Sequence, residues 1–120
     1  MLIAYYSLTG NVRRFVAKTG LAAVEIKPGL MLAEPFVCLT GTYGFGQVAV
    51  PVADFLAANS AYLAGVAASG NRNWGGNYAK AADIIATQYG VPIVGRFELA
   101  GTDADVAKIR EFVSENLSKG

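Results

Sequence analysis

Polar side chains occupy every second position in a short segment near the start of the chain, at Ser7, Thr9 and Asn11, with Gly10 between the last two. The apolar run 2–6 precedes this segment, and a helical pattern follows it. Hydroxyls, an amide and unpaired backbone N–H groups at the start of a helix attract an anion, because the helix dipole adds to their positive potential. The pattern therefore predicts a phosphate site. The alternative is an ordinary strand, an Asn or Thr N-cap and a helix without a ligand.

Two further segments are rich in glycine and carry an aromatic side chain: 40–46, which contains Tyr43, and 69–77, which contains Trp74. The flat faces of these rings suit stacking on a planar ligand, and ordinary packing is the alternative for both. A ligand with a phosphate at one end and a flat, largely apolar body at the other matches the three segments together. Flavin mononucleotide (FMN) has this form.

The glycines of the second segment suit the redox end of a flavin. One-electron reduction adds a proton at ring N5, and a peptide beside Gly44 or Gly46 can turn its carbonyl toward that proton without a Cβ penalty. The predicted cofactor-binding residues come from all three segments: Ser7, Leu8, Thr9, Gly10, Asn11 and Val12; Thr42, Tyr43, Gly44, Phe45 and Gly46; and Asn71, Arg72, Asn73, Trp74 and Gly75. Among these, Val12 can contribute only its backbone.

Arginines near these segments are expected to be solvated surface charges. This holds for Arg13 and Arg14, and also for Arg72 unless it lies near the flavin, where a cation would stabilise a reduced anionic ring. The chain has no histidine, which excludes Ser-His and Cys-His nucleophile systems and any imidazole metal site. We therefore expect no catalytic side chain and no metal ligand, so that a cofactor carries any redox chemistry.

The elements that must position these loops alternate along the chain. Apolar runs predict strands at 2–6, 23–26, 35–39, 62–68 and 93–99, and helical patterns follow Asn11 and span 48–57, 79–89 and 103–117, with Pro51 in a first turn and Thr102 as a cap. Alternating strands and helices indicate a doubly wound α/β domain with a parallel sheet. Ligands bind such sheets beyond the carboxyl ends of the strands, where the three loops would meet.

Composition limits the classes of function. A chain of 120 residues with 53% hydrophobic content predicts a single domain over 1–120. The net charge of +1, from 10 basic and 9 acidic residues, gives no electrostatic case for a nucleic-acid or membrane partner. The apolar start is too short for a secretory signal or a membrane span, so we expect a cytoplasmic protein. The single cysteine, Cys38, lies in an apolar run and is expected to be a buried structural thiol.

Two nucleotide-binding motifs were considered. Residues 44–49 match the dinucleotide pattern G-x-G-x-x-A, but no acidic residue stands about 20 positions further on to hold a ribose, so we treat the match as chance. The P-loop pattern G-x-x-x-x-G-K-[ST] does not occur, and nucleoside triphosphate hydrolysis of that kind is unsupported.

Four segments, 6–15, 42–46, 68–75 and 96–102, resemble the flavodoxins, and more narrowly the flavodoxin-like proteins of class Ib ribonucleotide reductase systems, the NrdI family. The Gly-Asn-Arg-Asn-aromatic-Gly element at 70–75 is the most specific of them. The resemblance implies a five-stranded parallel sheet in the order 2-1-3-4-5 that binds FMN noncovalently. The chain departs from the wider flavodoxin pattern at Val12, where a threonine commonly supports the phosphate, and it lacks the strongly acidic surface of many electron carriers.

The resemblance also implies a function, that of a redox accessory protein rather than a metabolic enzyme. In the family, the reduced flavin reacts with dioxygen, and superoxide drives assembly of the dimanganese and tyrosyl-radical cofactor in the small subunit of the reductase. That subunit is the expected partner, and the reductant, of flavodoxin or thiol type, is not identified. The alternatives are a general flavodoxin that carries electrons between proteins and a binding module that holds a phosphate ligand without redox chemistry.

Overall fold

The computed structural model describes residues 1–43 and 46–117, and of Arg72, Asn73, Trp74 and Leu117 it describes the backbone alone. The elements follow the predicted alternation: β1 (Leu2–Tyr5), α1 (Asn11–Thr19), β2 (Ala23–Glu25), β3 (Phe36–Thr40), α2 (Val50–Asn59), η1 (Ser60–Tyr62), β4 (Leu63–Gly70), η2 (Arg72–Asn77), α3 (Lys80–Tyr89), β5 (Ile93–Glu98) and α4 (Asp103–Leu117).

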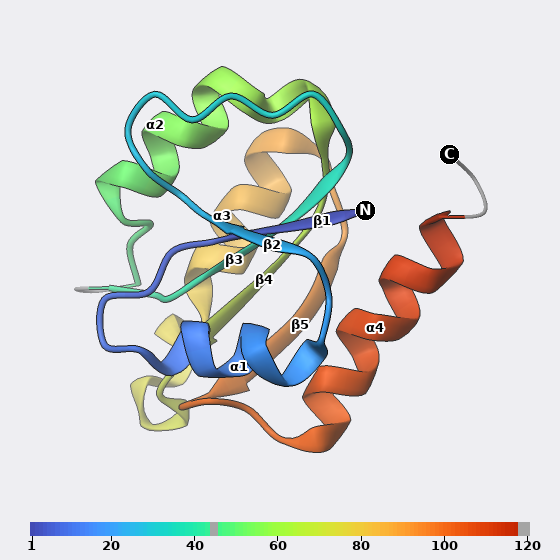
Figure 1. Ribbon diagram of the computed structural model, residues 1–120. Coiled ribbons are helices and arrows are strands. Elements are labelled where there is room, and N and C mark those ends of the chain that lie inside the picture. The colour runs from blue at the N-terminus through green and yellow to red at the C-terminus, as the bar shows by residue number, and fades with distance from the viewer. Residues whose placement is uncertain (44–45, 118–120) are drawn as a thin grey trace.

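The five strands form one parallel sheet in the order β2-β1-β3-β4-β5, which confirms the predicted fold class and strand order. Figure 1 shows α1 and α4 on one face of this sheet and α2 and α3 on the other. Alternate residues of the central strand β3 serve the two faces: Phe36 and Cys38 pack with α2 and α3, whereas Val37 and Leu39 pack with α1 and α4. Every residue of β3 is buried, as expected for a strand covered on both sides.

Some boundaries differ from the sequence prediction. Strand β4 extends two residues further than expected and includes Ser69 and Gly70, which had been assigned to the following loop. Helix α2 begins at Val50, two residues later than expected, and Pro51 lies in its first turn as predicted. Thr102 caps α4 as predicted: its hydroxyl accepts a hydrogen bond from the Asp105 N–H (3.3 Å), and the Asp105 carboxylate accepts one from the Thr102 N–H (2.9 Å).

The prediction of a buried thiol is confirmed, since Cys38 has no exposed surface. Burial raises the pKa of the Cys38 thiol to about 12, because the thiolate loses its hydration. Within residues 1–43 and 46–117, histidine, cysteine and carboxylate side chains form no cluster able to hold a metal ion. None of the helices in the same residues combines the length and the hydrophobicity needed to cross a membrane.

An aromatic stack joins α1 to the end of β5. The rings of Phe15 and Phe97 lie nearly parallel, with their centroids 4.0 Å apart. Gly101, in the turn after β5, lies directly against this stack: a Cβ there would sit 2.5 Å from Cδ2 of Phe15. The backbone of Gly101 is also left-handed, with φ of +72°. Glycine is therefore required at this position on two separate grounds.

These two grounds can be separated by substitution. Gly101→Ala should lower the free energy of unfolding by about 3 kcal/mol, because left-handed strain and overpacking against Phe15 add together. Gly90, which ends α3, has a similar φ of +67° but open space around a Cβ, so Gly90→Ala should cost only about 1 kcal/mol. Urea unfolding of both variants measures the difference, and equal losses would contradict the packing contribution at Gly101.

Candidate functional site

A pocket of about 270 Å³ opens at the carboxyl edge of the sheet, where β1, β3, β4 and β5 end. Its lining residues are Ser7, Leu8, Thr9, Asn11, Val12, Gly41, Thr42, Tyr43, Ser69, Gly70, Asn71 and Leu99. Residues predicted from all three loops thus meet around one space, as the topology requires. Gly41, Ser69, Gly70 and Leu99 were not among the predicted site residues.

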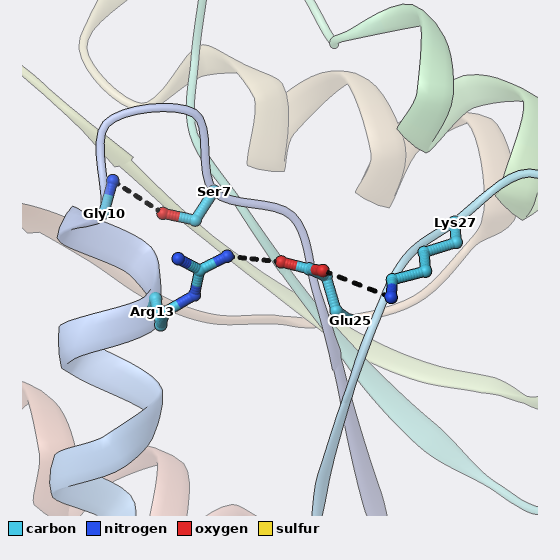
Figure 2. Close-up of polar contacts among 5 residues, drawn as sticks. All are labelled: Ser7, Gly10, Arg13, Glu25 and Lys27. Carbon is cyan, nitrogen blue, oxygen red and sulfur yellow. Dashed lines mark hydrogen bonds and ion pairs between the residues drawn. The ribbon is translucent and has the colours of Figure 1, made fainter.

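The first loop turns sharply between β1 and α1. The Gly10 N–H donates a hydrogen bond to Ser7 Oγ (3.1 Å), as Figure 2 shows, and Gly10 is left-handed with φ of 89°. Gly10 is the N-cap of α1 and provides no side-chain hydrogen bond, so the alternative of an Asn or Thr N-cap is wrong. The first turn of α1 also carries no acidic side chain. The positive end of this helix therefore lies at the pocket with no acidic residue of its own, and the nearby Glu25 carboxylate from β2 is paired with Arg13.

The second loop begins with a tightly held pair, Gly41 and Thr42. The buried Thr42 hydroxyl accepts a hydrogen bond from the Ala81 N–H (3.2 Å), which fixes this loop to the start of α3. A Cβ on Gly41 would lie 2.6 Å from Oη of Tyr43, so the absence of a side chain allows the Tyr43 ring to fold over the backbone. The Tyr43 ring also meets the Tyr6 ring edge-on, with their centroids 6.2 Å apart.

Tyr43 is half-buried in the wall of the pocket, and its contact with a cofactor stays a prediction. Burial raises the pKa of the Tyr43 phenol, and hydrogen bonds with the backbone of Leu8 and Gly41 oppose this shift. The phenol thus touches the first loop as well as its own. A planar ligand entering between these two loops would meet the Tyr43 ring.

A pair of backbone hydrogen bonds closes the second loop. The Tyr43 N–H donates to the Gln47 carbonyl (3.0 Å), and the Gln47 N–H donates to the Tyr43 carbonyl (2.6 Å). Gly46 is left-handed with φ of +87°, and a Cβ there would lie 3.0 Å from Oδ1 of Asn77, so the second loop packs against the third. Gly44 and Phe45 lie outside the described residues, and the peptide expected near flavin N5 stays a prediction.

The third loop has its two ends pressed together. A Cβ on Gly70 would lie 2.4 Å from the backbone nitrogen of Ala79, so only glycine allows β4 to end against the start of α3. Between these ends, Gly75 interrupts η2 with φ of 59° and ψ of −123°. The open space around Gly75 places this residue at the surface, whereas Asn71 lines the pocket. The side chains of residues 72–74 are not described, so stacking by Trp74 stays a prediction.

Leu99 is a pocket residue that the sequence did not reveal. It was expected to end the fifth strand, but β5 stops at Glu98 and Leu99 enters a turn closed by a hydrogen bond from the Gly101 N–H to the Glu98 carbonyl (2.8 Å). Its backbone is left-handed, with φ of 52°, and 72% of its surface is exposed. An exposed apolar side chain on a strained backbone at a pocket is typical of a ligand contact. In sequence it looks like one more apolar strand residue.

The chemistry of the pocket fits a flavin nucleotide. Hydroxyls at Ser7 and Thr9 and the open start of α1 provide hydrogen-bond donors for a phosphate at one end. Leu8, Tyr43 and Leu99 provide apolar and aromatic surface for a flat ring system. Asn11 also lines the pocket and adds an amide.

Comparison with solved structures and with known families shows which proteins this chain is similar to. The fold matches a short-chain flavodoxin associated with a non-canonical PDU bacterial microcompartment, with a TM-score of 0.71 and 19% identity, over 98% of this chain and 96% of the other. The chain therefore has a flavodoxin-like fold. The family described as NrdI flavodoxin-like matches residues 3–111, and the chain is 50% identical to Protein NrdI of Macrococcus caseolyticus (strain JCSC5402) over 96% of its own length and 90% of that protein. The chain therefore belongs to the NrdI flavodoxin-like family, which confirms the resemblance and implies that it binds a flavin.

The strain at Leu99 gives a prediction for the flavin-free protein. Leu99→Gly should raise the free energy of unfolding by about 1 kcal/mol, because relief of left-handed strain exceeds the added chain entropy of glycine. Leu99→Ala is the matched control: it removes the same exposed side chain but keeps a Cβ, so it should give no such gain. Thermal unfolding of both variants makes the comparison, and identical stabilities would show that the backbone at Leu99 is unstrained.

Proposed function

We propose that this protein binds FMN noncovalently and acts as the redox activator of a class Ib ribonucleotide reductase. The observation that carries the proposal is the meeting of an open helix start, two glycine loops and an apolar wall at one sheet edge, in a chain of the NrdI family. A pocket of this kind can hold a phosphorylated flavin at both ends, with the phosphate at the helix start and the ring system against the apolar wall. The proposed place of action is the cytoplasm.

The residues of the first loop would bind the phosphate. Backbone N–H groups at the start of α1, together with the Thr9 hydroxyl and the Asn11 amide, donate hydrogen bonds that are strengthened by the charge of the acceptor. Val12 is buried and has no polar side chain, so only its backbone N–H could contribute to phosphate binding, while its side chain packs in the core. Tyr43 and Leu99 would border the ring and exclude water from it. Arg72, Asn73 and Trp74 are proposed to complete the ring site from the third loop.

When bound and reduced, FMN would supply one electron to dioxygen, and the resulting superoxide would oxidise the manganese of the partner. The partner is proposed to be the small dimanganese subunit, in which a tyrosyl radical is then formed. The glycine loops at 41–46 and 70–76 are proposed as the docking face, because residues 41–43 and 70–71 line the pocket and so would lie near the flavin. Membership of the NrdI family favours this function over that of a general flavodoxin electron carrier.

The phosphate assignment can be tested with two substitutions. Thr9→Ala and Asn11→Ala should each weaken FMN binding by about 1 to 3 kcal/mol, the scale of a hydrogen bond to a charged group. Riboflavin, which lacks the phosphate, should bind both variants as it binds the unsubstituted protein. Flavin fluorescence titration measures the affinities of the two variants and of the unsubstituted protein for both flavins, and an equal loss for FMN and riboflavin would show that this loop serves the ring or the fold instead.

The functional proposal predicts radical formation that depends on oxygen. The FMN-loaded, fully reduced protein, mixed with oxygen and the manganese-loaded small subunit of a class Ib ribonucleotide reductase, should generate the tyrosyl radical, detected by electron paramagnetic resonance. The same mixture without oxygen should not, because no oxidant is formed. An unrelated reduced flavodoxin is the control. A radical yield no higher than in this control would refute the activator function and favour a general electron carrier.

A further inference from the structure

Two adjacent arginines in α1 point to different partners. Arg13 reaches β2, where its Nη2 lies 2.5 Å from Oε2 of Glu25, and Lys27 lies 3.8 Å from the other oxygen of the same carboxylate. Figure 2 shows this ion-pair group beside the Ser7–Gly10 turn. Arg14 instead folds back over the first loop, where its Nη2 donates a hydrogen bond to Oδ1 of Asn11.

The guanidinium of Arg14 lies against Gly10. A Cβ on Gly10 would be 3.1 Å from Nη1 of Arg14, a contact tighter than most side chains tolerate. Glycine thus serves two purposes at this position: it adopts the left-handed backbone and it leaves room for the arginine above the loop. The Arg14 charge is thereby placed at the N-terminal end of the helix, where the dipole is also positive.

The charge of Arg14 is not neutralised by a carboxylate in the structure. No ion pair formed among residues 1–43 and 46–117 includes Arg14, whereas Arg13 is paired with Glu25. The first turn of α1 contains no acidic residue. A cation held beside an uncapped helix start disfavours the empty loop, and a bound dianion would relieve both sources of positive potential.

The hydrogen bond from Arg14 also orients the Asn11 side chain. A guanidinium only donates, so the amide of Asn11 must present its oxygen to Arg14. The two N–H donors of the same amide are then turned away from Arg14, and Asn11 lines the pocket. The side chain of Val12, the next residue, has no donor. Asn11 therefore supplies amide donors and Arg14 supplies a positive charge, neither of which the side chain of Val12 can supply.

We propose that Arg14 is the residue that makes this pocket select a phosphate monoester, by adding its charge to the first loop and by holding Asn11 with its amide N–H groups free to donate. The proposal deepens the proposed FMN binding and rests on it for the identity of the ligand. Arg14 acts as a positioning and selectivity residue and takes no part in redox chemistry. Arg13 and Arg14 are both exposed, as expected of surface charges, and of the two only Arg13 is in an ion pair among the described residues; the proposal adds a role toward the ligand for Arg14.

The test compares Arg14→Gln with Arg13→Gln, a control of equal charge change one position away. Arg14→Gln should weaken FMN binding about tenfold, because a charge-assisted contact and the support of Asn11 are lost at an exposed site. Riboflavin affinity should stay within about twofold for both variants, and Arg13→Gln should leave FMN affinity within the same range. Arg14→Lys should recover part of the loss, since it retains the charge but not the planar fork.

The outcomes separate this proposal from the proposed function. If FMN binds the unsubstituted protein and Arg14→Gln behaves like Arg13→Gln, or loses FMN and riboflavin equally, the proposal for Arg14 is overturned while FMN binding stands. If the unsubstituted protein binds no flavin, inorganic phosphate replaces FMN, with the Gly10 and Asn11 amide signals followed by nuclear magnetic resonance. A phosphate response that is weakened by Arg14→Gln but not by Arg13→Gln would then support Arg14 alone, and the absence of any response would overturn it.

Discussion

The parallel pairing of β1 with β3 and of β3 with β4 is the constraint on which the site depends. In a parallel sheet all strands end at the same edge, so each loop that follows a strand is delivered to the same place. At the end of the ladder between β1 and β3, the Tyr6 N–H donates a hydrogen bond to the Leu39 carbonyl (3.0 Å). Immediately beyond this hydrogen bond, the chain leaves the sheet at Ser7 and again at Gly41. The pocket begins where the backbone pairing stops.

The strands and helices could be predicted because their signals are local. Runs of apolar residues with polar, glycine-rich breaks identify each strand, and burial of β3 on both faces matches its continuous apolar sequence. The end of β4 could not be predicted in the same way. Gly70 has the character of a loop residue, and it belongs to the strand because it pairs with Glu98 of β5. Its lack of a side chain leaves room for the backbone of Ala79.

The three loops of the site could be predicted from the sequence, because glycine and hydroxyl residues are typical of loops. The sequence could not show the direction of a side chain: Arg13 and Arg14 look alike, yet one pairs with Glu25 and the other with Asn11. Leu99 was missed for a related reason, since an apolar residue after a strand looks like its continuation. The ligand-free alternative has Asn or Thr as the N-cap, as propensity favours, whereas the tight turn closed by Ser7 places Gly10 there.

Backbone strain gathers at the same edge of the sheet. Among the described residues, Ala79 and Leu99 are the non-glycine residues with positive φ, of 49° and 52°. One begins α3 against the third loop, and the other lines the pocket from the turn after β5. Ala79 is fully buried, and the turn that contains Leu99 is closed by the hydrogen bond from the Gly101 N–H to the Glu98 carbonyl, so the surrounding structure maintains both conformations.

The burial of Cys38 has a consequence for chemical durability. Oxidation of a cysteine by peroxide starts from its thiolate, and a pKa of about 12 leaves almost none of this form at neutral pH. The sulfur also has no surface through which an oxidant or a second thiol can approach. Because the chain contains no other cysteine, the protein cannot be glutathionylated or crosslinked through sulfur while it is folded. Its backbone fold therefore stays independent of the redox state of its surroundings.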